Sequence, residues 1–399
     1  MTERGGERLG VYVENAYLVT PTEDGRRING HASVYAFTMF ACEVGKHFRS
    51  LTFFGRARRG SGEEDVYHPL PADVDLVELP HYESLTHVRE LARALGGAAR
   101  QCWRGLDRVD VVWVLGPHPL SFLVLALAAL RRKRIVLGVR QDTPRYYRSR
   151  VRNRGWLGAL PIVWLMDRSY RVLSRRLPTT VVGAELAGRY GGSAPVLPML
   201  VSLIDSREIP DEPPPRDLSG EVELLAVGRI EPEKAPLLLV EAFAELERRR
   251  PGRFRLTWAG DGRLERDVRE RVAALGLVDR VSLLGYVRVG PELVELYRRA
   301  GVFVHVAVTE GVPQAIVEAL ATGTPVVATD VGGVRAALAA GSAGMLVPAG
   351  DRDALVDAIL RLVDDDALRM QLASRGLDVA LASAGDVEAA RVARFLSSG

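Results

Sequence analysis

Short apolar segments rich in β-branched residues alternate with amphipathic segments along most of this 399-residue chain. In the first half, strands are expected at 9–14, 51–55, 74–79, 109–115 and 134–139, with helices at about 32–44, 85–100 and 120–130. Strand-like runs separated by helix-like runs are typical of βαβ units, whose strands are parallel. The alternation therefore predicts an α/β fold built on a parallel sheet.

The pattern stops at a proline-rich, charged stretch at 209–216 and then starts again. Strands are expected at 221–227, 254–259, 281–284, 302–308 and 325–328, and helices at 236–249, 263–274, 291–299, 313–321 and 353–363. Such a stretch is typical of an inter-domain linker. We expect a first domain at 1–205, a linker at 206–220, a second domain at 221–385, and a helix at 386–399 that packs back on the first domain. Two doubly wound domains bind ligands in the cleft at the carboxyl ends of their strands.

Composition excludes several classes of protein. Two cysteines cannot form a disulfide framework, which favours a reducing cytoplasm. The first eight residues are polar and do not form a signal peptide. The longest apolar run, at 120–130, is shorter than the ~20 residues that span a bilayer. We therefore expect a cytoplasmic protein, associated at most with the inner face of the cell membrane.

The most informative segment is 302–329, where an apolar run ends at Thr309-Glu310-Gly311. A helix pattern follows Pro313 and carries Glu318, and Gly323 and Pro325 end it before a β-branched run. This pattern predicts strand, loop, helix, turn and strand. Free N–H groups and the positive end of the dipole make the helix start an anion site. At ~1.5 Å rise per residue the two glutamates lie on the order of 12 Å apart, a span that suits a nucleotide-linked molecule. Surface glutamates on a helix are the alternative.

Lysine is scarce in this chain: 50 of the 53 basic residues are arginine. One of the three lysines, Lys234, follows Arg229 in a loop after the first strand of domain two. Both side chains can bind a diphosphate from one loop and stabilise charge on a phosphate leaving group. Two solvated surface cations are the alternative interpretation.

Four other motifs allow a functional and a structural interpretation. His118 lies in the loop at the end of an apolar strand, where it either hydrogen-bonds a sugar or assists proton movement, or simply caps the strand end. Gly30, expected in the loop before the first long helix, either brings N–H groups to a phosphate or starts that helix. The run 259–262 is a ligand-contacting turn or a plain one. Asp364-Asp365-Asp366 is more typical of a solvated helix end than of a metal site.

Between residues 131 and 176 there are 14 Lys or Arg against two Asp, so the stretch carries a charge of +12. Tryptophans and leucines lie among these arginines at 141–176. This composition fits a patch that rests on an anionic membrane, and equally a core-facing helix with a solvated charged face. Nucleic-acid binding is not indicated, because the stretch matches no stacking motif or binding module.

Together these residues make the chain resemble the GT-B glycosyltransferases, and among them the large retaining family 4, also called glycosyl transferases group 1. The resemblance is specific over about 224–350 and implies two Rossmann-like domains facing a cleft. Glu310 and Glu318 match the paired-glutamate motif of that family. Ala235 stands where the family usually has a glycine.

The resemblance implies a role for each site residue. Glu310 contacts the hydroxyls of the donor sugar, Glu318 binds the ribose, and Arg229 and Lys234 bind the diphosphate. Further donor contacts are the loop at 311–315, the segment at 285–287, and in domain one Gly30 and His118. The predicted catalytic residues are His118, Arg229, Lys234 and Glu310. The predicted donor-binding residues are Gly30, Arg229, Lys234, Tyr286, Val287, Glu310, Gly311, Val312, Pro313, Gln314 and Glu318.

The implied reaction is retaining transfer from a UDP or GDP sugar to a hydroxyl of a glycan, a glycolipid precursor or a small natural product. The departing diphosphate takes the acceptor proton, so no metal or cofactor is expected, and the donor is a co-substrate. Two other classes share the pattern: a nucleotide-sugar epimerase, which consumes donor without acceptor, and a non-catalytic nucleotide-sugar sensor, which binds without turnover.

Overall fold

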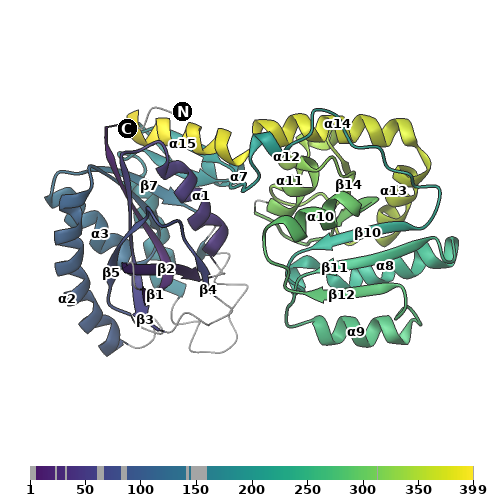
Figure 1. Cartoon of the computed structure of the whole chain (residues 1–399), viewed down its shortest axis with the longest axis horizontal. Coiled ribbons are helices and arrows are strands. Elements are labelled where there is room, and N and C mark those ends of the chain that lie inside the picture. Colours follow the sequence, from purple (N-terminus) through teal and green to yellow (C-terminus); the bar gives the residue numbers. More distant parts are fainter. Residues whose placement is uncertain are drawn as a thin grey trace. The chain divides into compact units, whose positions relative to one another are not determined.

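The computed structural model divides the chain into two compact units, which are considered separately (Figure 1). Unit 1 contains Met1–Leu203 and Gly385–Gly399, and unit 2 contains Ile204–Ala384. The structure describes residues 6–22, 25–31, 34–60, 67–81, 88–140, 143–144, 160–311 and 313–398.

The described part of unit 1 contains a nine-stranded sheet. Its parallel strands run β5-β3-β1-β6-β7-β8-β9, and β2 and β4 add an antiparallel extension beside β1. The strands are β1 Arg8–Thr22, β2 Gly25–His31, β3 Ser50–Arg59, β4 Tyr67–Pro69, β5 Asp75–Leu79, β6 Val111–Gly116, β7 Arg134–Val139, β8 Thr179–Val182 and β9 Val196–Met199.

Both faces of this sheet are buried, as alternate residues of β6 show. Val111 and Trp113 belong to one apolar core, and Val112 and Val114 belong to the other. Burial on two faces explains why the parallel strands read as continuous apolar runs. The helices of unit 1 are α1 Tyr35–Gly45, α2 Val88–Gly105, α3 Pro119–Leu130, α6 Leu160–Leu173, α7 Ala184–Ala187 and α15 Gly385–Ser398. No helix among the described residues of the chain is long and apolar enough to cross a membrane.

Unit 2 is a parallel sheet with the strand order β12-β11-β10-β13-β14-β15. Numbered along unit 2, this is the order 3-2-1-4-5-6 of the Rossmann fold, which reverses between β10 and β13. The strands are β10 Val222–Val227, β11 Phe254–Ala259, β12 Val281–Gly285, β13 Val302–His305, β14 Val326–Thr329 and β15 Met345–Val347. The helices are α8 Pro236–Arg249, α9 Glu265–Ala274, α10 Pro291–Arg299, α11 Gln314–Ala321, α12 Val334–Ala337, α13 Arg352–Asp364 and α14 Asp366–Ala382.

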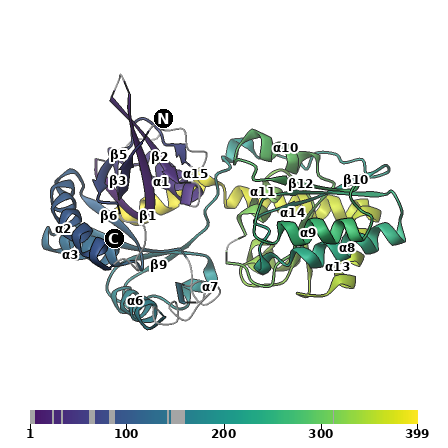
Figure 2. The same cartoon turned by 90° about the horizontal axis from the view of Figure 1, so that it is seen from below.

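Helices cover both faces of the second sheet as well. The side chains of α8, α9 and α13 form one core with Leu224 and Val304, and those of α10, α11 and α12 form another with Leu225 and Phe303. Figure 2 shows α10 on one side of this sheet and α8, α9 and α13 on the other. Because the strands of this sheet are all parallel, every loop that follows a strand lies at the same edge of the sheet. The strand order puts the switch point at the carboxyl ends of β10 and β13, where an open α/β sheet binds its ligands.

The expected position of Gly30 is wrong. Gly30 lies in strand β2, paired with Tyr17 of β1 and His68 of β4, and is buried. The segment Gly25–His31 is rich in arginine, glycine and asparagine, which are not strand formers by themselves. Pairing with the second half of β1 makes it a strand.

Candidate functional site

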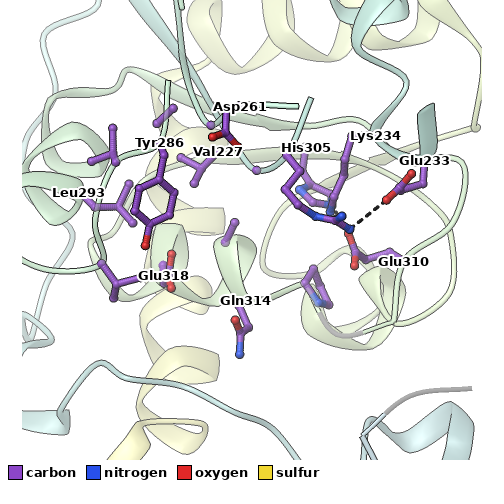
Figure 3. Close-up of a pocket in the computed structure, with 18 of the residues that line it drawn as sticks. Val227, Glu233, Lys234, Asp261, Tyr286, Leu293, His305, Glu310, Gln314 and Glu318 are labelled. Atoms are coloured by element: carbon purple, nitrogen blue, oxygen red, sulfur yellow. Dashed lines mark hydrogen bonds and ion pairs between the residues drawn. The ribbon is translucent and has the colours of Figure 1, made fainter. Parts of the chain in front are cut away.

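A cavity of about 390 Å³ lies at the switch point of unit 2 (Figure 3). Its lining comes from the loops after β10, β11, β12 and β13 and from the start of α11. The lining residues include Arg229, Glu233, Lys234, Gly260, Asp261, Tyr286, Val287, Leu293, His305, Thr309, Glu310, Pro313, Gln314 and Glu318. The structure thus brings together eight of the predicted site residues: Arg229, Lys234, Tyr286, Val287, Glu310, Pro313, Gln314 and Glu318.

Glycines let the loops after β10 and β11 pass very close to each other. A Cβ on Gly260 would lie 2.1 Å from the carbonyl oxygen of Gly228, and one on Gly262 would lie 2.4 Å from that of Ile230. Both Gly228 and Gly260 have positive φ, 140° and 145°. The run 259–262 is therefore a close approach of two backbones that no larger residue fits.

Lys234, Glu310 and His305 form a charged cluster at one end of the cavity, away from Tyr286 and Glu318 (Figure 3). Glu310 Oε2 is ion-paired with Lys234 Nζ and lies 2.9 Å from His305 Nε2. Burial alone would raise the pKa of Glu310, but the hydrogen bond to His305 and the charge of Lys234 lower the pKa to about 2. Glu310 is therefore an anion throughout the physiological range.

His305 stays neutral in this cluster. Its side chain is only 3% exposed, and burial, helped by Lys234, lowers its pKa although Glu310 opposes the shift. Lys234 itself sits in a short 3₁₀ turn, and the following Ala235 has φ 40° and ψ 51°, the left-handed conformation that favours glycine. The residue that departs from the family pattern thus keeps the backbone that the glycine would adopt.

Arg229 is more exposed than Lys234 and pairs with Glu233 at 3.0 Å. Its side chain is 55% exposed, so the pair contributes little to stability. Both predicted diphosphate ligands line the cavity, and each has a carboxylate partner that an incoming anion would compete with.

Glu318 occupies the other end of the cavity, on the second turn of α11. Its Oε2 accepts a hydrogen bond of 2.8 Å from the hydroxyl of Tyr297 on α10. Burial raises the pKa of Glu318, and the tyrosine hydroxyl partly offsets that rise. A carboxylate held in this way is a strong acceptor for the hydroxyl groups of a ligand.

Gly311, Pro313 and Gln314 lie between Glu310 and Glu318 in the sequence. Pro313 caps α11, and the N–H group of Gly311 donates to Glu310 Oε1 at 3.2 Å. Gly311 does not belong to the cavity lining, and Val312 lies outside the described residues.

The two predicted site residues of unit 1 have structural roles in that unit. His118 caps α3, with its Nδ1 accepting from the N–H of Leu120 at 3.3 Å. The same nitrogen lies 2.9 Å from the hydroxyl of Tyr12 and 3.1 Å from Glu14 Oε2, and burial lowers the pKa of the imidazole. His118 therefore occupies the N-cap position of α3, at the carboxyl end of β6. Gly30 lies in β2, as described above.

The prediction from sequence missed His305, which lines the cavity, and Tyr297, which supports Glu318. His305 left a signal, since it is the one polar residue in the apolar run at 302–308. The aspartates at 364–366 form a helix boundary: Asp365 caps α14, and Asp366 pairs with Arg369. Among the described residues, no group of three or more His, Cys, Asp or Glu side chains is arranged to hold a metal ion.

Comparison with known proteins finds similarity over this part of the chain. Residues 221–365, which carry the whole cavity, match the family model described as Glycosyl transferases group 1. This segment is similar to that family. Among its relatives are the D-inositol 3-phosphate glycosyltransferases of Pseudarthrobacter chlorophenolicus, 40% identical over 156 residues, and of Frankia alni, 41% identical over 168 residues. The matches cover 38% and 40% of this chain and 37% and 40% of those relatives, so well under half of each protein is aligned.

Solved structures resemble the whole chain in fold. WaaG, a glycosyltransferase involved in lipopolysaccharide biosynthesis, has a TM-score of 0.69 at 14% identity and covers 98% of this chain and 100% of its own. Anabaena HepE in complex with UDP and glucose has a TM-score of 0.68 at 17% identity, with 98% and 100% covered. Sucrose-phosphate synthase from Thermosynechococcus elongatus has a TM-score of 0.68 at 17% identity, with 98% and 99% covered. The predicted GT-B fold class, with two Rossmann-like parallel-sheet units, is confirmed.

Proposed function

We propose that this protein is a retaining glycosyltransferase that moves a sugar from a UDP or GDP sugar to a hydroxyl acceptor. The observation that carries the proposal is the cavity of unit 2. It has two cations, Arg229 and Lys234, and a buried carboxylate at each end, Glu310 and Glu318. A nucleotide sugar presents sugar hydroxyls, a diphosphate and a ribose in that order, and these groups match the lining from one end to the other.

Each group of the donor has a partner in this arrangement. Arg229 and Lys234 bind the diphosphate: Arg229 exchanges its partner Glu233 for a phosphate oxygen, and Lys234 uses the N–H groups that are not bonded to Glu310. Glu310 accepts from the sugar hydroxyls, and Glu318 accepts from the ribose. Tyr286 and Val287 border the base, and Gly311, Val312, Pro313 and Gln314 complete the donor site at the start of α11. The bound UDP and glucose of the HepE structure support a donor of this class.

The reaction balances without a resident cofactor. The acceptor oxygen bonds to the anomeric carbon on the face that the diphosphate leaves, so the configuration is retained. The bond between that carbon and the diphosphate oxygen breaks, and the acceptor proton passes to the departing oxygen. Arg229 and Lys234 stabilise the negative charge that develops there. His118 is proposed, from the family resemblance, as a further contact of the sugar.

The acceptor in this proposal is a hydroxyl of a glycan, a glycolipid precursor or a small natural product. A membrane-borne acceptor is favoured by α6, whose Ile162, Trp164 and Leu165 are 60%, 53% and 59% exposed. Arg168 lies over the ring of Trp164, at 5.8 Å from its centroid. Exposed apolar side chains among arginines suit a surface of anionic lipid, with the protein resting on the inner face of the cell membrane.

A thermal-shift screen of nucleoside diphosphates and their sugars tests the proposal and identifies the base. We expect one nucleotide series to raise the melting temperature, and Glu310→Ala and Lys234→Ala each to lower sugar transfer by more than ~100-fold. Near wild-type transfer in both variants would refute the assignment. Consumption of donor without acceptor would indicate an epimerase, and binding without turnover would indicate a sensor.

A further inference from the structure

The two side chains that bind the Glu310 carboxylate contact the same oxygen atom. Oε2 is ion-paired with Lys234 Nζ and lies 2.9 Å from His305 Nε2, whereas Oε1 accepts only the backbone N–H of Gly311 at 3.2 Å among the described contacts. A carboxylate oxygen can accept two hydrogen bonds. Oε2 therefore already accepts its two hydrogen bonds, whereas Oε1 can still accept one from a ligand hydroxyl.

The protonation of the pair fixes the direction of its hydrogen bond. Glu310 is ionised and can only accept, and the buried His305 is neutral and carries one N–H. The contact at 2.9 Å therefore requires the proton on Nε2, which donates to the carboxylate.

His305 is better placed than a surface residue to hold this geometry. It is the last residue of β13, paired with Ala328 of β14 in the sheet, and its side chain is 3% exposed. Phe303, two residues earlier, has its ring centroid 6.3 Å from the imidazole. The imidazole is thus anchored to the core, while Glu310 lies in the loop beyond the strand.

We propose that His305 is a positioning residue that turns the Glu310 carboxylate so that Oε2 faces Lys234 and Oε1 receives the donor sugar. This inference rests on the proposed function and adds a residue to it. Through Oε2, the residue that recognises the sugar is held at a fixed place relative to the cation that binds the diphosphate. In this proposal His305 acts on the sugar through Glu310.

Two substitutions separate positioning from simple packing. His305→Leu keeps a side chain of similar size but removes the N–H group that bonds Glu310. His305→Gln keeps an N–H group that can donate a hydrogen bond. We expect His305→Leu to lower kcat/KM for turnover of UDP-glucose about 10- to 100-fold, the effect of losing a hydrogen bond to a charged group. Calorimetric binding of UDP should change by about threefold or less, because UDP lacks the sugar. His305→Gln should recover most of the turnover. GDP and GDP-mannose are measured in parallel.

The outcomes are distinct. Equal loss of UDP binding and turnover in His305→Leu, or no loss of either, overturns the positioning role. If the wild-type chain neither binds nor turns over any of these nucleotides, the proposed function itself fails. A measurement on the unaltered chain covers the case in which the leucine variant does not fold. Imidazole ¹⁵N shifts of the full chain at pH 7 should show the neutral Nε2–H form of His305, and the Nδ1–H form would refute the inference.

Discussion

Replacing Lys234 by methionine should destabilise unit 2 even without any ligand. Lys234 and Glu310 have side chains that are 18% and 14% exposed, so water screens their attraction only modestly. Methionine keeps the length of the lysine stem but removes the charge. Glu310 would then be buried with only His305 and the Gly311 N–H group as hydrogen-bond donors.

The size of the effect follows from the acidity of Glu310. Its pKa falls from an ordinary 4.5 to about 2, against the effect of burial, because of His305 and Lys234. At about 1.4 kcal/mol for each tenfold change in an equilibrium, the two partners together stabilise the folded state by about 3 kcal/mol. Lys234 shares this with His305, so we expect Lys234→Met to cost about 1–2 kcal/mol. For a unit of this size, that lowers the melting temperature by about 2–8 °C.

The loss should depend on pH in a defined direction. A carboxylate whose pKa is lowered by folding stabilises the protein above its unfolded pKa, and that contribution is lost as the pH falls through the folded pKa. The difference in unfolding free energy between wild type and Lys234→Met should therefore be largest at pH 6–7. This difference should become smaller as the pH falls from 4.5 to about 2.

Urea unfolding at several pH values measures this difference, with Lys46→Met as the matched control. Lys46 pairs with Glu43 at 2.6 Å, but its side chain is 60% exposed, so its loss should cost under about 0.5 kcal/mol. A double-mutant cycle with Glu310→Gln should give a coupling of about 1–2 kcal/mol. A loss for Lys234→Met no larger than that of the control, or one that does not change with pH, would refute the reasoning.

Two further predictions concern the other end of the cavity and helix α6. Because burial raises the pKa of Glu318, its stabilising contribution is present below pH 4.5 and lost as the pH rises through the folded pKa. Glu318→Gln should therefore be at least as stable as wild type at pH 8, and this advantage in stability should shrink or reverse at pH 5. The variant should nevertheless bind nucleoside diphosphate more weakly. A variant that is less stable than wild type at pH 8 would contradict this prediction. Trp164→Ser should weaken co-sedimentation with vesicles rich in anionic lipid. Co-sedimentation that changes neither with this substitution nor with the content of anionic lipid would count against membrane contact.

Most of the parallel strands could be predicted from the sequence because burial on two faces leaves an apolar run. The residues of β10 and β13 are apolar almost without exception, and the loops that follow these strands carry the site. The cluster of Glu310 and Lys234 was predictable for the same reason, since each residue follows such a strand. Local pattern and tertiary structure agree there.

The extension of β1 and its partner β2 could not be predicted in the same way. Gly30 is a strand residue because Tyr17 and His68, distant in sequence, offer their backbones for pairing. Nothing within 25–31 encodes that partnership. The role of His305 was hidden for a different reason: its partner lies five residues on, beyond the end of the strand, and only the fold shows that the two side chains meet.

Helix α15 completes unit 1 from beyond unit 2. Its Ala389, Val392 and Leu396 fill the core that Phe37 and Phe40 of α1 also occupy. During synthesis on the ribosome, unit 2 therefore emerges as one continuous stretch and can form its core. Unit 1 at that stage still lacks helix α15. Synthesis thus imposes an order in which unit 2 matures before unit 1. Until the final helix arrives, the apolar surface of α1 is exposed to chaperones and to other nascent chains.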